Sequence, residues 1–130
     1  MNYLADTVAI VHYLRRPQRL GAQCHRILRE AEQGQHQVLV SAISLMEVLY
    51  LAEAKRISLP LNELLDVLHQ SRNFSLAPVD SVVVESAVAI DDVPELHDRI
   101  LVATAVAYGV AILTSDRVIA ASRHVQAVWG

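Results

Sequence analysis

The stretch HDRILVATAVAYGVAILTSDRVI, residues 97–119, decides the fold class of this chain. It is almost wholly apolar between two aspartates, Asp98 and Asp116. Its first half has the length and spacing of a helix, from Asp98 to Tyr108, and a glycine follows that helix directly. Its second half contains a short buried strand, Val110 to Leu113, and Asp116 stands where the next helix should begin. The stretch therefore predicts a helix, a strand and a helix, with an acid at the start of each helix.

The same alternation of strands and helices runs through the rest of the chain. Strands are predicted at Tyr3–Ala5, Gln37–Val40, Phe74–Ala77, Val110–Leu113 and, at an edge, Val125–Trp129. Helices are predicted at Thr7–Leu14, Gln18–Glu32, after Ser41 through Ala54, Pro60–Ser71, Asp80–Ile90, Asp98–Tyr108 and, briefly, after Asp116. Strands joined through helices need crossover connections, which give a parallel sheet with helices on both faces. The predicted fold class is therefore α/β, a three-layer α/β/α sandwich with a central, mainly parallel sheet.

The composition fits such a buried sheet. Hydrophobic residues make up 53% and charged residues 19% of the 130 residues, which is more apolar than an average globular domain. The apolar runs are far shorter than the ~20 residues that a membrane-spanning helix needs, and the N-terminus lacks the pattern of a signal peptide. The single cysteine, Cys24, suits a reducing compartment. We therefore expect one domain, residues 1–130, located in the cytoplasm and not in a membrane.

Four acidic residues fall at one edge of the predicted sheet. Asp6 directly follows the first strand, and Asp116 follows the VAIL strand by two residues. Glu47 lies one turn into the helix after the QVLV strand, while Asp98 opens a helix whose first residue should lie at that same edge. Parallel sheets bind ligands at the carboxyl ends of their strands. All four acids are therefore candidates for one cleft.

Helix capping is the competing explanation for each acid. Aspartate at a helix start accepts hydrogen bonds from free backbone N–H groups, and Ser44-Leu-Met-Glu47 has the pattern of a capping box. Four carboxylates at one edge repel each other, however, and a hard divalent cation such as Mg²⁺ offsets that repulsion, whereas no Cys/His set has zinc spacing. Such ions promote the attack of water on a phosphodiester. Thr7, Thr114 and Ser115 could then orient water or phosphate, or simply satisfy local backbone groups.

The net charge of −3 argues at first sight against a nucleic-acid binder. Removing the four acids from that total leaves +1 for the rest of the chain, so a metal-loaded cleft need not repel phosphate. Arg15, Arg16 and Arg19 cluster where the first helix should end, and they are candidate contacts for RNA phosphates. A solvated helix end explains the same three arginines equally simply.

Three blocks of the chain resemble the PIN-domain family, and in particular the VapC-like toxins of prokaryotic toxin–antitoxin systems. They are LADTVAIVHYL at 4–14, VSAISLMEVLYLA at 40–52, and ELHDRILVATA with AILTSDRVI at 95–105 and 111–119. Their order and spacing carry the resemblance, which spans nearly the whole chain. At Val8 the chain departs from the family's pattern, because many relatives carry Asn or Ser there.

The resemblance implies a function and partners. It implies the α/β/α sandwich and a nuclease: an Mg²⁺- or Mn²⁺-dependent endoribonuclease that leaves a 5′-phosphate and a 3′-hydroxyl. Family toxins are usually homodimers, and a cognate antitoxin holds them inactive by placing its tail in the groove. The family's catalytic and metal-binding acids correspond to Asp6, Glu47, Asp98 and Asp116.

Two other functions are compatible with parts of this pattern. A signalling receiver domain has a similar length, a parallel sheet and a phosphate-accepting aspartate. It needs an acid pair after the first strand and a lysine after the last, whereas here Ala5 precedes Asp6 and the only lysine is Lys55. A PIN-like scaffold that only binds a partner would differ from the nuclease by failing to bind metal through its carboxylates.

Overall fold

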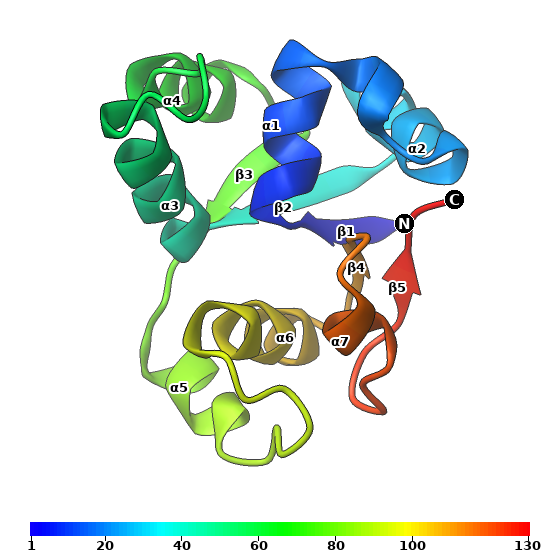
Figure 1. The fold of residues 1–130 in the computed structure, drawn as a ribbon. Coiled ribbons are helices and arrows are strands. Elements are labelled where there is room, and N and C mark those ends of the chain that lie inside the picture. Colours follow the sequence, from blue (N-terminus) through cyan, green and yellow to red (C-terminus); the bar gives the residue numbers. More distant parts are fainter.

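A five-stranded parallel sheet lies at the centre of the computed structural model, which describes residues 1–130 (Figure 1). The strands follow the spatial order β3-β2-β1-β4-β5, so the first strand is the central one. Their bounds are Asn2–Ala5 for β1, Gln37–Ser41 for β2, Phe74–Ala77 for β3, Ala111–Leu113 for β4 and Ala127–Val128 for β5. The predicted parallel sheet and its edge strand are therefore confirmed.

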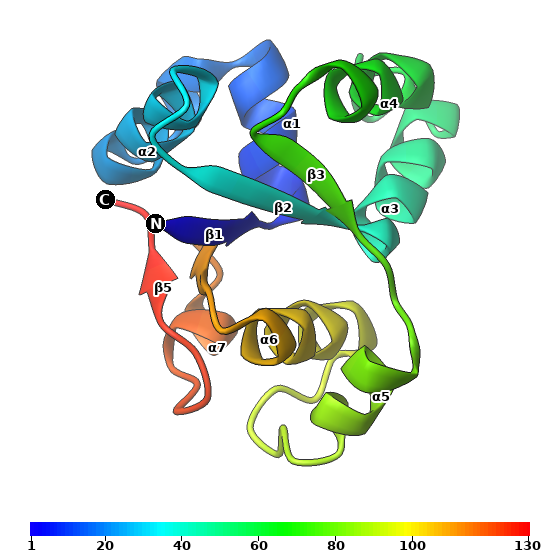
Figure 2. The same cartoon turned by 180° about the vertical axis from the view of Figure 1, so that it is seen from behind.

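Helices cover both faces of the sheet, as the two opposite views show (Figures 1 and 2). One layer contains α1 (Thr7–Arg15), α2 (Ala22–Glu32), α3 (Ala42–Glu53) and α4 (Leu61–Gln70). The other contains α5 (Ser81–Ala87), α6 (Leu96–Tyr108) and α7 (Arg117–Ala120). No helix in either layer has the length and apolar character needed to cross a membrane. The chain thus forms the predicted three-layer α/β/α sandwich.

The central strand β1 is buried because it contributes to a core on each face of the sheet. Tyr3 and Ala5 pack in the core beneath α1 to α4, whereas Leu4 packs in the core against α6. Strand β4 divides in the same way, with Leu113 on the first side and Ile112 on the second. A parallel sheet that is covered on both faces needs apolar side chains in both directions. This need explains the high apolar content of the chain.

The second helix begins later than the predicted Gln18. Residues Pro17–Arg19 form a separate 3₁₀ turn, and α2 starts only after Gly21. The carbonyl of Trp129 accepts a hydrogen bond from the Cys24 N–H at 2.9 Å, which satisfies one free donor of the first helical turn. A Cβ at residue 21 would lie 2.2 Å from that carbonyl oxygen, so only glycine permits this approach. A contact with the other end of the chain therefore sets the start of α2.

Helix α5 is shorter than the predicted Asp80–Ile90. It begins as expected, because the Asp80 carboxylate accepts a hydrogen bond from the Val83 N–H, but it ends at Ala87. Arg99 of α6 donates two hydrogen bonds to the Ala87 carbonyl, at 3.0 and 2.8 Å. An arginine from the neighbouring helix therefore satisfies a carbonyl at the end of α5.

The end of α3 contains the one non-glycine residue with a left-handed backbone, Lys55, at φ 59°. The Lys55 N–H donates to the Ala52 carbonyl at 3.0 Å, and the Arg56 N–H donates to the Leu51 carbonyl at 2.9 Å. These two bonds define a Schellman motif, in which glycine normally takes the left-handed position. A side chain in that conformation costs roughly 1–2 kcal/mol.

Candidate functional site

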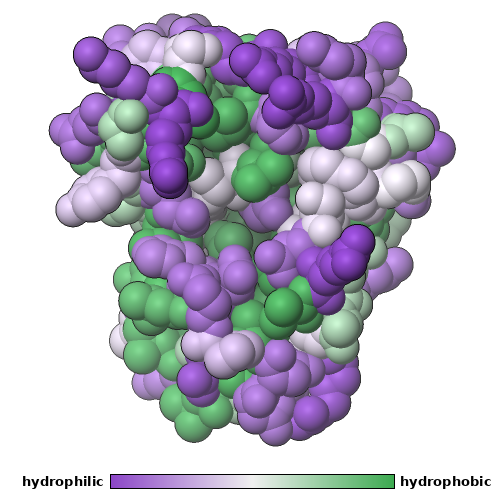
Figure 3. Space-filling model, in the orientation of Figure 1, coloured by the Kyte–Doolittle hydropathy of each residue, from purple (hydrophilic) through white to green (hydrophobic).

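A cleft of about 160 Å³ opens at the carboxyl edge of β1 and β4. All four acids predicted from the sequence line it, together with Thr7, Val8, Leu101 and Ser115. No lysine, arginine or histidine lines the cleft. Figure 3 shows hydrophilic residues across the middle of this face, between the upper helix layer and α6. Four separate elements of the fold therefore bring carboxylates to one place.

Asp6 and Asp116 both act as helix N-caps, as the capping explanation predicts. One oxygen of Asp6 accepts a hydrogen bond from the Ala9 N–H at 2.7 Å, and one oxygen of Asp116 accepts from the Ile119 N–H at 3.0 Å. Each cap uses Oδ1, so the Oδ2 of each aspartate takes no part in the cap. Capping and a role in the cleft are therefore compatible, because the cap fixes the carboxylate at the cleft wall.

Glu47 does not form the predicted capping box. The N-cap of α3 is Ser41, whose hydroxyl accepts from the Ile43 N–H at 3.1 Å. The Oγ1 of Thr7 lies 2.9 Å from both the Glu47 carboxylate and the Ser44 hydroxyl. A contact between α1 and α3 therefore replaces the local contact within α3, and it holds Glu47 beside the cleft.

Asp98 does not open its helix, in contrast to the prediction. Helix α6 begins at Leu96, and its N-cap is Glu95, which accepts from the Asp98 N–H at 2.7 Å. Asp98 therefore lies within the first turn, where only its backbone takes part in the cap. Its carboxylate remains available to the cleft. Glutamate is not among the usual N-cap residues, so the sequence pattern did not indicate this helix start.

The electrostatics of the cleft disfavour four ionised carboxylates. Burial raises the pKa of Asp6 to about 6, and the charges of Asp116 and Asp98 add to the rise, although hydrogen bonds from the Thr114 hydroxyl and the Ala9 N–H oppose it. Burial also raises the pKa of Asp98 to about 6, and the nearby acids add to this rise as well. None of the four carboxylates forms a salt bridge. The cleft therefore holds excess negative charge, of which only the nearby His97 offsets a part, by lowering the pKa of Asp98.

The predicted supporting residues lie beside the acids. Thr114 is buried and accepts from the Asp116 N–H at 3.0 Å, which fixes the turn between β4 and α7. Ser115 and Thr7 both line the cleft. Val8, where the chain departs from the family's pattern, also lines it and adds an apolar side chain to the rim. The structure thus places a hydroxyl next to each of the two capping aspartates.

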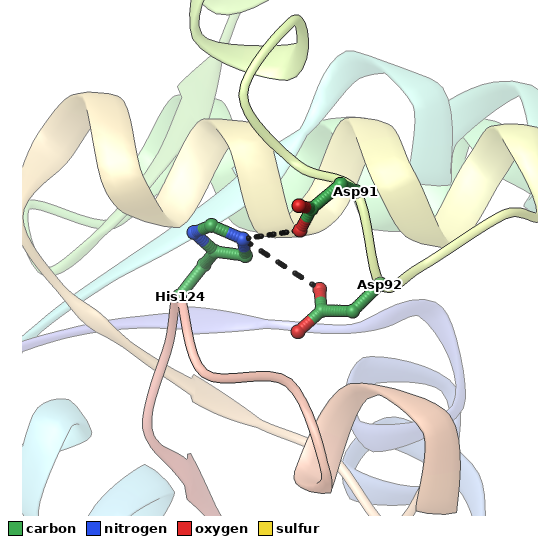
Figure 4. A group of neighbouring side chains, drawn as sticks. All are labelled: Asp91, Asp92 and His124. Atoms are coloured by element: carbon green, nitrogen blue, oxygen red, sulfur yellow. Dashed lines mark hydrogen bonds and ion pairs between the residues drawn. The ribbon is translucent and has the colours of Figure 1, made fainter.

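The tightest acidic cluster of the molecule is a different one, formed by Asp91, Asp92 and His124 (Figure 4). It is the only group of three such side chains whose ligand atoms all lie within 4.8 Å of one another. Asp91 pairs with His124 at 3.0 Å and with Arg123 at 2.7 Å, while Asp92 accepts from the Ser122 hydroxyl and the Arg123 N–H at 2.9 Å each. These contacts join two loops. The four acids of the cleft are therefore more widely spaced than this satisfied cluster.

The three predicted phosphate contacts differ in their surroundings. Arg15 forms a two-pronged ion pair with Glu63, which occupies its guanidinium. Arg16 and Arg19 form no salt bridge. All three line a second pocket, at the far end of α1 from the cleft.

The fold and the sequence together identify the family. The sequence model of the PIN domain matches residues 3–124. The chain belongs to the PIN domain family. All four acids of this PIN domain fall within the matched range. A search of curated proteins finds no match to the chain.

Solved structures share the PIN fold along nearly the full chain. VapBC2 from Rickettsia felis, bound to a DNA fragment from its promoter, is similar with a TM-score of 0.74 and 12% identity, covering 100% of each chain. FitAcB from Neisseria gonorrhoeae gives 0.65 and 22%, covering 96% of this chain and 95% of the other. A toxin–antitoxin complex from Klebsiella pneumoniae gives 0.65 and 21%, covering 95% and 94%. At these identities the likeness establishes the fold.

Proposed function

We propose that this PIN domain is a metal-dependent endoribonuclease that acts as the toxin of a toxin–antitoxin pair. The observation that carries the proposal is the cleft itself: four carboxylates from separate elements line it, and no cationic side chain lines it or forms a salt bridge with them. Its position at the carboxyl ends of parallel strands is the usual place for a ligand in this class of sheet. We assign the catalytic and metal-binding roles to Asp6, Glu47, Asp98 and Asp116.

The donor set of the cleft fits Mg²⁺ or Mn²⁺. All of its charged groups are carboxylates, which are the ligands that hard divalent cations prefer. The raised pKa values of Asp6 and Asp98 show that burial and mutual repulsion disfavour the ionised groups in the absence of a cation. A bound divalent cation would offset this repulsion, lower the pKa of a water molecule and neutralise charge on a phosphodiester.

The chain's own residues then position the reacting groups. The caps on Asp6 and Asp116 fix two carboxylates, and Thr7 fixes the carboxylate of Glu47. Ser115 lines the cleft and can donate a hydrogen bond to a water molecule or to a phosphate oxygen. The acids can accept a proton from an attacking water, which suits hydrolysis of a phosphodiester. The resemblance to the family implies that the products carry a 5′-phosphate and a 3′-hydroxyl.

An antitoxin is the proposed partner. The similar solved structures include FitAcB and toxin–antitoxin complexes from other bacteria, and this chain covers at least 95% of its own length in each of these matches. The shared fold supports a related arrangement, in which a segment of the antitoxin blocks access to the acids.

Together with the residues of the cleft, this leads us to propose that residues 1–130 act as one nuclease domain in the cytoplasm.

A homodimer is the proposed assembly. Helix α5 exposes Val82 and Val84, and the residue that follows it, Val88, is exposed too. Helix α3 exposes Met46 and Tyr50. Figure 3 shows hydrophobic residues at the lower left of the molecule, over α5. Soluble monomers rarely leave large apolar patches uncovered. Burial of these side chains against a second copy would remove them from water.

The direct test is cleavage of a single-stranded RNA by the purified chain. We expect cleavage with Mn²⁺ or Mg²⁺, none with EDTA, and products that carry a 5′-phosphate. The Asp6→Asn protein keeps a good helix cap, because asparagine caps as well as aspartate, yet it should be inactive. Equal cleavage by both proteins would falsify the assignment. Calorimetric titration with Mn²⁺ separates the nuclease from a binding scaffold, which would show no carboxylate-dependent binding.

A further inference from the structure

A basic pocket of about 540 Å³ lies at the far end of α1 and α3 from the acidic cleft. Its charged and titratable lining comes from the end of α1, the following turn and the residues after α3, and no acid lines it. The side chains are His12, Arg15, Arg16, Arg19, Lys55 and Arg56. In a chain whose net charge is −3, five cations around one hollow are a marked local excess.

Most of these cations are available to a ligand. Arg15 is the exception, because Glu63 occupies its guanidinium. Arg16, Arg19, Lys55 and Arg56 form no salt bridge. The local field is positive: burial lowers the pKa of His12, and the charges of Arg19 and Arg16 lower it further. The pocket therefore attracts an anion.

The backbone at Lys55 provides an independent observation. Lysine occupies the left-handed position of the Schellman motif at the end of α3, where glycine is the ordinary residue. Lysine is strained there, and strained residues of this kind gather at functional sites. The strain also places the chain's only lysine on the wall of the basic pocket.

The pocket and the cleft are linked by the same two helices. Helix α1 carries Asp6 at its N-cap and Arg16 at its C-cap, about 15 Å apart along the axis at ~1.5 Å per residue. Helix α3 carries Glu47 in its middle and is followed by Lys55 and Arg56. A flexible polyanion that is cut in the cleft can therefore reach the pocket with a phosphate a few nucleotides away.

We propose that the basic pocket binds a backbone phosphate of the single-stranded RNA whose scissile bond lies in the acidic cleft. The inference rests on the proposed function and names how its substrate is held. Guanidinium groups grip phosphate oxygens with two donors each. Such contacts position a strand without reading its sequence. The pocket then favours substrates long enough to span from the cleft to Arg16 and Arg56.

Binding of a fluorescently labelled oligouridylate of about twelve nucleotides tests the proposal. The Asp6→Asn background with Mg²⁺ prevents cleavage, and anisotropy is measured over a series of salt concentrations. The double change Arg16→Gln, Arg56→Gln should weaken binding about tenfold and lower the slope of log K against log salt by about 1. The matched control Arg26→Gln, Arg72→Gln removes the same charge from outside the pocket and should change neither quantity by more than about twofold.

A second variant separates binding from stability. Lys55→Gly relieves the left-handed strain, so its melting temperature should rise, while its affinity for the same RNA should fall. Equal RNA binding by the double variant and its control overturns the proposal. A polyglutamate probe serves as a second polyanion, and the proposal is also overturned if the double variant loses affinity for polyglutamate alone and not for RNA. Cleavage is scored separately in the chain with Asp6 intact. An inactive chain that still binds RNA through the pocket refutes the nuclease and supports the pocket.

Discussion

The molecule contains two acidic clusters, and they differ in how their charges are satisfied. Asp91 and Asp92 lie within reach of His124, and hydrogen bonds from His124 and Arg123 lower the pKa of Asp91 to about 2. In the cleft at the sheet edge, the pKa values of Asp6 and Asp98 rise to about 6 instead. Side chains of the protein itself thus satisfy the charges of the tighter cluster. The looser one has no cationic side chain in its lining, which supports our proposal that a metal ion binds there.

The largest expected effect separates the two clusters by activity. Asp116→Asn should lower RNA cleavage about a thousandfold, because loss of a metal ligand removes several kcal/mol of transition-state stabilisation. Asp92→Asn should leave cleavage within about twofold, since Asp92 takes no part in the cleft. Initial rates with Mn²⁺ measure both. Similar losses in the two variants would end the distinction between the clusters.

The pH dependence of stability sharpens the comparison in the EDTA-treated protein. The pKa of Asp6 is raised from 3.8 in the unfolded chain to about 6 in the fold, so the folded state favours the protonated acid. The stability that Asp6 contributes to the fold is therefore fully present below about pH 4, and it is lost as the pH rises through about 6. The loss amounts to about 2–3 kcal/mol from Asp6, with a smaller share from the more exposed Asp98.

Urea unfolding at pH 4 and pH 8 measures this loss. Asp6→Asn removes the titrating group and keeps the helix cap, so its free energy of unfolding should change less between the two pH values. Added Mg²⁺ should restore stability to the original chain at pH 8 but not to the variant, because the cation binds the ionised carboxylates. A variant with the same pH dependence as the original chain would contradict the assigned burial cost.

Loss of the hydrogen bond that holds Glu47 should have a moderate effect on RNA cleavage. Thr7→Val keeps the shape of the side chain but removes the hydroxyl that donates to Glu47 or Ser44. We expect cleavage to fall about tenfold, about 1.4 kcal/mol, with helix content unchanged. Thr7→Ser retains the hydroxyl and should recover most of the activity. Failure of the serine variant to recover would mean that the methyl group, rather than the hydrogen bond, matters.

The smallest effect concerns the satisfied cluster. Ser122→Ala removes a hydroxyl that donates to Asp92 at 2.9 Å and accepts from the His124 N–H, so the junction of the two loops should weaken slightly. We expect a small fall in melting temperature and no change in Mn²⁺ affinity. Differential scanning fluorimetry with and without Mn²⁺ checks both. A change in metal affinity would show that this cluster, and not the cleft, binds the ion.

Much of the fold was predictable because the local sequence pattern and the tertiary packing favour the same arrangement. Apolar strands that alternate with helices leave few arrangements other than a parallel sheet covered on both faces. The position of the acids followed from chain direction: a residue after β1 and a residue after β4 must lie at the same edge.

The rest depended on contacts between distant parts of the chain. The predicted capping box at Ser44 does not form, because Glu47 accepts a hydrogen bond from the hydroxyl of Thr7, which lies on another helix. The start of α2 depends on the carbonyl of Trp129, more than a hundred residues away. The start of α6 depends on an uncommon glutamate cap, Glu95. The sequence indicated only the three arginines of the basic pocket. Lys55 and Arg56 are distant from them in the sequence, and only the fold brings them to the same pocket.

The central position of β1 has a consequence for synthesis on the ribosome. Its neighbours in the sheet are β2 and β4, so the first strand made gains its second partner only when residues 111–113 have emerged. Asp116 follows them after two further residues, Thr114 and Ser115. A nascent chain that has been translated only as far as β3 holds two of the four acids of the cleft and three of the five strands. Translation thus delays assembly of the four proposed catalytic acids until Asp116, the last of them along the chain, has been made.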